Sequence, residues 1–235
     1  MKLLAIDTAG TACSAALLCA GRLTERVEVA PRRHGELLLG MMDELLQAAG
    51  ISLTALDALA FGRGPGAFTG VRIASAVAQG AAFGAGLPVI GVSNLAALAQ
   101  AAWQRWGARR IAAALDARMG EVYWGTYWID DAGLARAADG EQVSVPDQVR
   151  VPAGGDWWGV GSGWGVQQAA LAAHFAADRT TPSQPTLIQV EPDLVATARD
   201  LLPLAVADWG AGQAAAAGAV LPVYLRDRVA EPPRR

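Results

Sequence analysis

The sequence predicts an α/β protein with two lobes, and two observations support this prediction. In the first half, short apolar runs typical of strands alternate with segments whose apolar residues recur at helical spacing. Near residue 110 the pattern restarts, because RIAAALD at 110–116 repeats the hydropathy of LLAID at 3–7 and both runs end in aspartate. We therefore expect an N-terminal lobe over residues 1–107 and a smaller, less regular C-terminal lobe over 108–235.

The first lobe is expected to begin with a β-hairpin pair and to continue with alternating helices and strands. Ala20-Gly21-Arg22 suits a hairpin turn, Ser93 suits a helix N-cap, and Gly50 and Gly107 suit helix C-caps. The expected strands cover 3–7, 13–19, 23–29, 56–61 and 88–91, and the expected helices cover 35–50, 71–84 and 93–106.

The second lobe is less regular in its sequence. Strands are expected at 110–116, 121–129 and 157–161, with loop and irregular strand at 130–156. Further along, the pattern predicts a helix at 166–177, a proline-containing connector at 178–192, a helix at 194–209 interrupted near Pro203, and a short strand at 223–225.

Composition limits the classes of function. Hydrophobic residues make up 53% of the 235 residues, yet no run reaches the roughly 18 apolar residues of a membrane helix. The first residues read as a strand rather than a signal peptide, so we expect a cytoplasmic protein. A net charge of −3 argues against a broad nucleic-acid-binding face. Cys13 and Cys19 would lie about 20 Å apart on one strand and are expected to be unbridged. With His34 and His174 they show no metal-ligand spacing.

Two aspartates are candidate nucleotide contacts. Asp7 and Thr8 follow the first strand, and Asp116 holds the equivalent position in the second half. In two-lobed nucleotide-binding folds such a turn contacts phosphate through backbone amides while the carboxylate orients a metal or a water. The two aspartates would then face each other across a cleft. The alternative is that each aspartate simply caps a hairpin turn.

The run GRGPGAFTG at 62–70 stands between a strand and a helix, where backbone amides can bind an anion. Gly64 and Gly66 are the candidate contacts. The run lacks the Gly-Lys-Ser/Thr ending of a P-loop, so no lysine reaches a phosphate. Its glycines also suit close packing of one backbone on another. Of the two, we favour a structural role in which the run positions the helix behind it.

Two helices carry features of a partner surface. The helix at 71–84 is rich in alanine and contains Gly80 and Gly84, although a glycine inside a helix costs about 1 kcal/mol relative to alanine. Its small residues would let another helix approach closely, within the domain or on a partner. The helix at 35–50 has more apolar positions than one buried face needs, which fits either a partner surface or a larger core.

Six blocks of the sequence, in order along nearly the whole chain, resemble the TsaB (YeaZ) family of bacterial tRNA threonylcarbamoyladenosine biosynthesis proteins. The blocks are LLAIDTAGTACSAALL, PRRHGELLL, FGRGPGAFTGVRIASAVAQGAA, PVIGVSNLAAL, LDARMGEVYW and PVYLRDRVA. The resemblance implies a two-lobed fold of the ASKHA class (actin-like, Hsp70-like, RNase H-like) with a reduced second lobe.

The resemblance also implies a function. It predicts a non-catalytic scaffold that activates the catalytic paralogue TsaD and, with it, binds the ATPase TsaE, to form threonylcarbamoyladenosine at position 37 of tRNA. TsaD carries a metal-binding histidine pair where this chain has Asn94 and Leu98, and neither can replace histidine on iron or zinc. We therefore expect no metal and no intrinsic cofactor, with ATP or ADP left open at an interface of the complex. Contact with tRNA is expected mainly through the complex.

The family's interfaces use helices that match 35–50 and 71–84. The resemblance therefore predicts contacts to the partner, and to a second copy in a homodimer, at Leu37, Leu38, Met41, Leu45, Arg72, Ser75, Ala78 and Gln79. The alternative function is an active ATPase or phosphotransferase that uses Asp7 and the glycine run.

Overall fold

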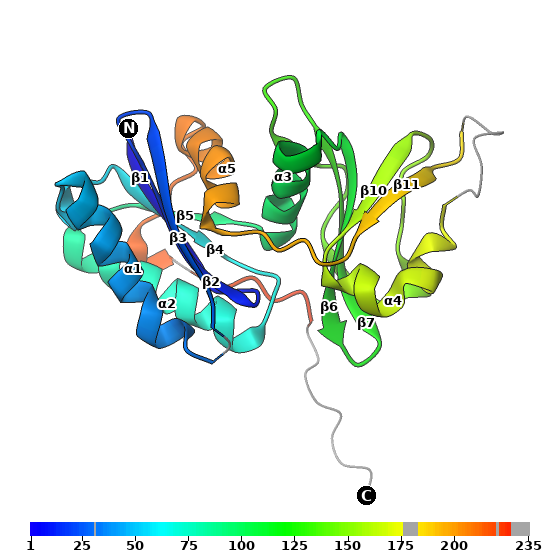
Figure 1. Ribbon diagram of the computed structural model, residues 1–235, viewed down its shortest axis with the longest axis horizontal. Coiled ribbons are helices and arrows are strands. Elements are labelled where there is room, and N and C mark those ends of the chain that lie inside the picture. The colour runs from blue at the N-terminus through cyan, green and yellow to red at the C-terminus, as the bar shows by residue number, and fades with distance from the viewer. Residues whose placement is uncertain (31, 176–182, 220, 227–235) are drawn as a thin grey trace, which may run out of the picture.

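The computed structural model describes residues 1–30, 32–175, 183–219 and 221–226, which form two sheets and the helices around them (Figure 1). The first sheet has the strand order β3-β2-β1-β4-β5, in which β1, β2 and β3 are antiparallel and β4 and β5 run parallel to β1. Its strands are β1 (Lys2–Asp7), β2 (Ala12–Cys19), β3 (Arg22–Val29), β4 (Ala58–Gly62) and β5 (Val89–Val92).

The second sheet repeats this order. Its strands are β6 (Arg110–Arg118), β7 (Glu121–Ile129), β8 (Ala135–Ala137), β9 (Gln142–Ser144), β10 (Asp156–Val160) and β11 (Thr186–Glu191). They are arranged β11-β10-β6-β7-β8, with β9 also paired to β7, and β10 runs parallel to both β6 and β11. The predicted internal repeat and the two-lobed ASKHA-like α/β fold are therefore confirmed.

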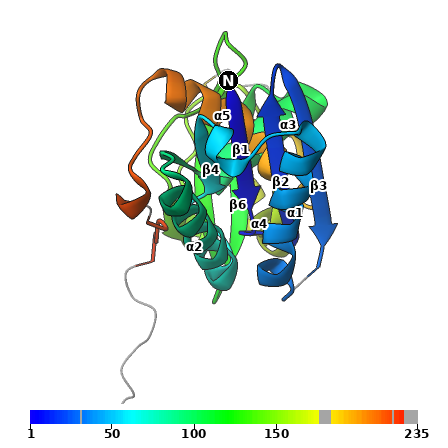
Figure 2. The ribbon, with the colours of Figure 1, turned by 90° about the vertical axis from the view of Figure 1, so that its left-hand side faces the viewer.

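The helices and sheets form five layers. Helices α1 (His34–Ala49) and α2 (Phe68–Ala85) lie side by side on the outer face of the first sheet, as Figure 2 shows. Helices α3 (Asn94–Trp106) and α5 (Ala198–Gly210) fill the space between the sheets, and α4 (Ser162–Ala172) covers the outer face of the second (Figure 1).

Both faces of the first sheet are covered, which explains its apolar strands. On β1, Leu3 and Ala5 belong to the core between the sheets, whereas Leu4 and Ile6 belong to the core beneath α1 and α2. The tryptophan-rich core beneath α4 is separate and contains Trp124, Trp157 and Trp164.

Each of the two central helices packs on the sheet of the lobe to which the sequence did not assign it. The sequence assigned α3 to the first lobe, but it packs on β6, β7 and β8 of the second sheet. It assigned α5 to the second lobe, but α5 packs on β1, β2, β4 and β5 of the first. Strands β1 to β5 form the first sheet and β6 to β11 the second, while the two helices are exchanged.

Most predicted helix ends agree with the structure. Gly50 and Gly107 adopt the left-handed conformation at the ends of α1 and α3. Ser93 caps α3, and its hydroxyl accepts hydrogen bonds from the backbone amides of Leu95 and Ala96, each 3.2 Å long. Helix α2 begins three residues before the predicted Val71.

Three predictions for the second half were wrong. The expected connector at 178–192 contains strand β11, which pairs with β10. Helix α5 runs through Pro203, and a capping box formed by Thr197 and Asp200 fixes its start. Residues 223–225 form no strand, although the Val223 amide donates to the Arg63 carbonyl oxygen at 2.8 Å. Residues 176–182, which end the predicted helix at 166–177 and begin the connector, lie outside the described residues.

Cys13 and Cys19 are free thiols on β2. Across the described ranges, no helix combines the length and apolar character that crossing a membrane requires.

Candidate functional site

The carboxylate of Asp7 is buried at the end of β1, and its side chain is 3% exposed. The Asn94 Nδ2 group donates a hydrogen bond to Asp7 Oδ1 at 2.8 Å, and the Ala9 amide donates to the same oxygen at 3.3 Å. Asn94 Oδ1 in turn accepts from the Gly64 amide at 2.8 Å. Asn94, the first residue of α3, therefore joins the β1–β2 turn to the glycine run.

Burial raises the pKa of Asp7 to about 6, against the opposing effect of the hydrogen bond from Asn94. A group whose pKa is raised by folding stabilises the folded state below its ordinary pKa near 3.8. That stabilisation is lost as the pH rises through about 6. The difference corresponds to about 3 kcal/mol, at ~1.4 kcal/mol for each pH unit.

We expect Asp7→Asn to stabilise the protein at pH 8 by about 1–3 kcal/mol, because the amide carries no charge to desolvate. The variant should also lose most of the decline in stability between pH 4 and 6. Urea denaturation across this range measures both effects, with the exposed Asp131→Asn as control. Destabilisation of Asp7→Asn at pH 8 would show that the folded state requires the ionised carboxylate.

The glycine run packs directly on the turn that carries Asp7 and Thr8. An added Cβ at Gly70 would lie 1.9 Å from the Thr8 carbonyl oxygen, and one at Gly66 would lie 2.7 Å from the Ala9 carbonyl oxygen. The Thr8 hydroxyl, fully buried, donates to the Gly70 carbonyl oxygen at 2.6 Å. These contacts agree with the close-packing interpretation of the run.

Two backbone amides of the run bind within the protein. The Gly64 amide is used by Asn94, and the Ala67 amide donates to the Ala9 carbonyl oxygen at 2.8 Å. Gly64 itself has a φ of +98°, which favours glycine. Of the two glycines expected to contact an anion, Gly64 thus has its amide occupied by Asn94 of α3, while beside Gly66 the Ala67 amide is occupied by the β1–β2 turn.

Asp116 lies in a different environment from Asp7. It is on β6 at a register shift, where its carboxylate accepts from the Arg118 amide at 2.8 Å and pairs with the Arg118 guanidinium at 3.0 Å. The Asp116 amide donates to Ser162 Oγ at 3.1 Å. In the described part of the chain, Asp116 makes no hydrogen bond or ion pair with Asp7.

The structure also places the two residues that the resemblance matches to the metal-binding histidines of TsaD. Leu98 is 1% exposed in the core between the sheets, and Asn94 is engaged as described. Within the described residues, no three His, Cys, Asp or Glu side chains gather closely enough to hold a metal ion.

The predicted partner contacts divide into buried and exposed residues. Five are covered by the protein's own fold, so the prediction that they present side chains to a partner needs correction: Leu38, Met41, Leu45, Ser75 and Ala78. Their helical spacing places them on the face that packs on the first sheet. Arg72 and Gln79 are exposed, and Leu37 is partly exposed.

The outer face of α2 carries large apolar side chains that sequence patterning missed. Phe83 is 79% exposed and Phe68 is 59% exposed, while Leu39 on the neighbouring α1 is 58% exposed. The Arg72 guanidinium lies 3.2 Å above the Phe68 ring and 5.0 Å from the centre of the Tyr224 ring. The spacing 68, 72, 79 and 83, which follows the helical repeat, was the signal that could have found this face.

Three helix-interior glycines lie beside these apolar side chains with open space above them. An added Cβ at Gly40, Gly80 or Gly84 would meet no atom within 4 Å. Each glycine costs about 1 kcal/mol relative to alanine, and no contact inside the protein requires it. The exposed apolar side chains and the small residues together describe a surface on α1 and α2 that another chain could approach closely. We call this surface the α1/α2 face.

Comparisons with known proteins extend over most of the chain. A family model described as TsaD, tRNA N6-adenosine threonylcarbamoyltransferase, matches residues 27–232. The tRNA threonylcarbamoyladenosine biosynthesis protein TsaB of Escherichia coli (strain K12) is 43% identical over 233 residues, which cover 98% of this chain and 96% of that protein. Its counterpart in Haemophilus influenzae is 40% identical over 237 residues, covering 97% and 95%.

Solved structures agree with these relatives. A structure described as YeaZ from Pseudomonas aeruginosa is 48% identical and superposes with a TM-score of 0.86, covering 95% of this chain and 99% of that chain. A second structure from that organism, described as an uncharacterised protein with similarity to peptidase YEAZ, is also 48% identical. It has a TM-score of 0.85 and covers 96% and 99%.

Proposed function

Since this chain belongs to the TsaB (YeaZ) family of tRNA threonylcarbamoyladenosine biosynthesis proteins, we propose that it serves that synthesis as a non-catalytic subunit activating a TsaD-related partner. The α1/α2 face is the observation that carries the proposal. A large exposed phenylalanine beside glycines with open space above them is costly for an isolated protein and favourable at an interface.

Activation would occur through a shift in the partner's conformations. A protein that binds one conformer of its partner more tightly than another increases the population of that conformer. Within this proposal the chain itself contributes no reacting group. The ATPase TsaE and the tRNA would be engaged through the complex, and a homodimer through the α1/α2 face would be the resting form.

The geometry around Asp7 supports a structural role for that residue. In an active ATPase the carboxylate would be directed toward nucleotide and metal, whereas Asp7 is 3% exposed and bonded to Asn94. The neighbouring glycine run uses two of its amides within the protein. Both observations favour the scaffold over the ATPase alternative.

We expect reconstituted synthesis to depend on this chain. Purified TsaD-related partner, TsaE, tRNA, ATP and threonylcarbamoyl-adenylate are combined with and without the chain, and the modified nucleoside is measured by mass spectrometry after digestion of the tRNA. Modification should proceed only when the chain is present, and Asp7→Asn should support it as well as the unaltered protein does.

Two outcomes would contradict the proposal. Equal modification without the chain would remove the scaffold role. Hydrolysis of ATP by the isolated chain, abolished by Asp7→Asn, would support the ATPase alternative instead. The urea denaturation of Asp7→Asn described above serves as the control, because it shows whether a loss of hydrolysis comes from unfolding of the variant.

A further inference from the structure

A cavity of about 490 Å³ lies between the two lobes, and neither Asp7 nor Asp116 lines it. Its walls come from β5 and the glycine run in the first lobe and from β7 and β8 in the second, with α3, α5 and residues of 213–219 and 221–223 completing them. The volume falls in the range of small-molecule sites, about 300–1,000 Å³.

Four charged side chains line this cavity: Arg63, Arg136, Glu141 and Asp208. The charges are balanced, with two arginines and two carboxylates. A polyanion such as a nucleotide would meet two carboxylates as well as two arginines, and a simple cation would meet two arginines as well as two carboxylates, so neither gains from every charge in the lining. The balance of charge therefore favours a ligand that carries both signs.

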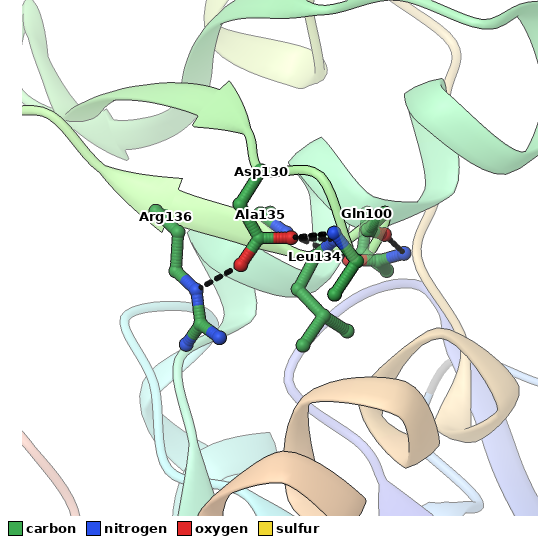
Figure 3. A network of polar contacts seen from close by, with 7 residues as sticks. Gln100, Asp130, Leu134, Ala135 and Arg136 are labelled. Carbon is green, nitrogen blue, oxygen red and sulfur yellow. Dashed lines mark hydrogen bonds and ion pairs between the residues drawn. The ribbon is translucent and has the colours of Figure 1, made fainter.

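Two of the four side chains already have partners. The Arg136 Nε group pairs with Asp130 at 2.7 Å, and Asp130 also accepts from the Leu134 amide at 2.9 Å (Figure 3). Gln100 on α3 fixes this wall, because its side chain accepts from the Ala135 amide at 2.9 Å, as the figure shows. Arg136 is thus held in place by a rigid turn.

Glu141 is also held. One of its oxygens, Oε1, accepts a hydrogen bond from the Tyr127 hydroxyl at 2.6 Å and another from the Ser93 hydroxyl. Burial, and after it the nearby Glu141, raises the pKa of Tyr127, so its hydroxyl stays protonated and continues to donate. The Glu141 carboxylate is therefore held in one position at the cavity wall.

The remaining two side chains are Arg63 and Asp208. Within the described part of the chain, neither makes a hydrogen bond or an ion pair with its side chain. Asp208 nevertheless interacts electrostatically with both arginines of the cavity. Burial raises the pKa of Asp208, and the positive charges of Arg136 and Arg63 oppose that rise. The Arg63 side chain runs across β5, where its Cδ lies 3.2 Å from the position of a Cβ added at Gly91.

We propose that the cavity between the lobes binds a small zwitterion of the α-amino acid class. The carboxylate of the ligand would accept from the Arg63 guanidinium, and its ammonium group would donate to Asp208, with Glu141 as a second acceptor. A ligand bound in this way would link the glycine run, which carries Arg63, to α5, which carries Asp208, and to the segment between β8 and β9, which carries Glu141. This inference is independent of the proposed function, because none of its residues lies on the α1/α2 face.

Binding is tested with the proteinogenic amino acids at millimolar concentration, using isothermal titration calorimetry and the shift in melting temperature. Acetate and methylamine present each charged half alone, and inorganic phosphate presents a multiply charged anion. We expect at least one amino acid to bind and to raise the melting temperature, while acetate, methylamine and phosphate do neither.

The variants Arg63→Gln and Asp208→Asn should each weaken binding by about tenfold or more, because each removes one charge-assisted contact. Arg22→Gln and Asp131→Asn change exposed charges outside the cavity and should bind like the unaltered protein. Circular dichroism and melting temperatures without ligand show whether each variant is folded.

Three results would overturn the inference. In the first, no amino acid binds. In the second, both cavity variants bind amino acids as tightly as the unaltered protein does. In the third, acetate or phosphate binds as tightly as the best amino acid. The reconstitution assay is unaffected by these results, so failure here is distinct from failure of the proposed function.

Discussion

Replacement of Gly70 by alanine is expected to destabilise the protein by about 3 kcal/mol or more. The new Cβ would lie 1.9 Å from the Thr8 carbonyl oxygen and 2.9 Å from its carbonyl carbon, and both atoms belong to the backbone. The Thr8 hydroxyl also donates a hydrogen bond to the Gly70 carbonyl oxygen, which holds the two segments together at this point. To make room for the Cβ, α2 and the β1–β2 turn would have to separate. Urea denaturation measures the loss.

Gly80→Ala is the matched control, because Gly80 lies in the same helix with nothing within 4 Å of an added Cβ. It should stabilise the protein by roughly 0.5–1 kcal/mol. A similar loss of stability for both variants would mean that glycine is needed along α2 for its backbone rather than for contact with the turn.

Replacement of Phe83 by glutamate is expected to weaken binding of the TsaD-related partner by about 100-fold or more and to reduce reconstituted modification accordingly. A phenylalanine that is 79% exposed loses little stability when changed, whereas a charge in an apolar interface leaves an unpaired group buried. Calorimetry or surface plasmon resonance measures the affinity, and light scattering shows whether the proposed homodimer also dissociates.

Val166→Glu is a suitable control, because Val166 is another exposed apolar side chain, 56% exposed, but lies on α4 outside the α1/α2 face. Leu45→Arg, in contrast, would not test the interface. Leu45 is 1% exposed in the core beneath α1 and α2, so a charge there would unfold the protein. Unchanged affinity of Phe83→Glu would place the partner surface elsewhere.

Much of the fold was predictable from local patterns. Strands β1 and β4 in the first sheet are apolar on both faces, and the glycines that end α1 and α3 act through their own backbone conformation. Strand β11 was missed for three reasons. It is only six residues long, it follows a stretch with prolines at 182 and 185, and it lies at the edge of its sheet, where one side is unpaired within the described residues.

The candidate site was less predictable, because side-chain direction depends on tertiary packing. Leu38, Met41 and Leu45 were correctly placed on one helical face, but periodicity cannot tell whether that face meets the core or a partner. The role of Asn94 depends on two contacts distant in sequence, to Asp7 and Gly64. Arg63 was read as part of the glycine run, yet its side chain lines the cavity between the lobes.

The exchange of α3 and α5 between the lobes has a consequence for synthesis on the ribosome. The first five strands are complete by residue 92, but the inner face of their sheet packs on α5, which ends at Gly210. An emerging chain therefore carries this apolar sheet face without α5 until residues 198–210 have also been translated. Helix α5 closes a core that β1 begins, which ties the maturation of the first lobe to the synthesis of residues far along the chain.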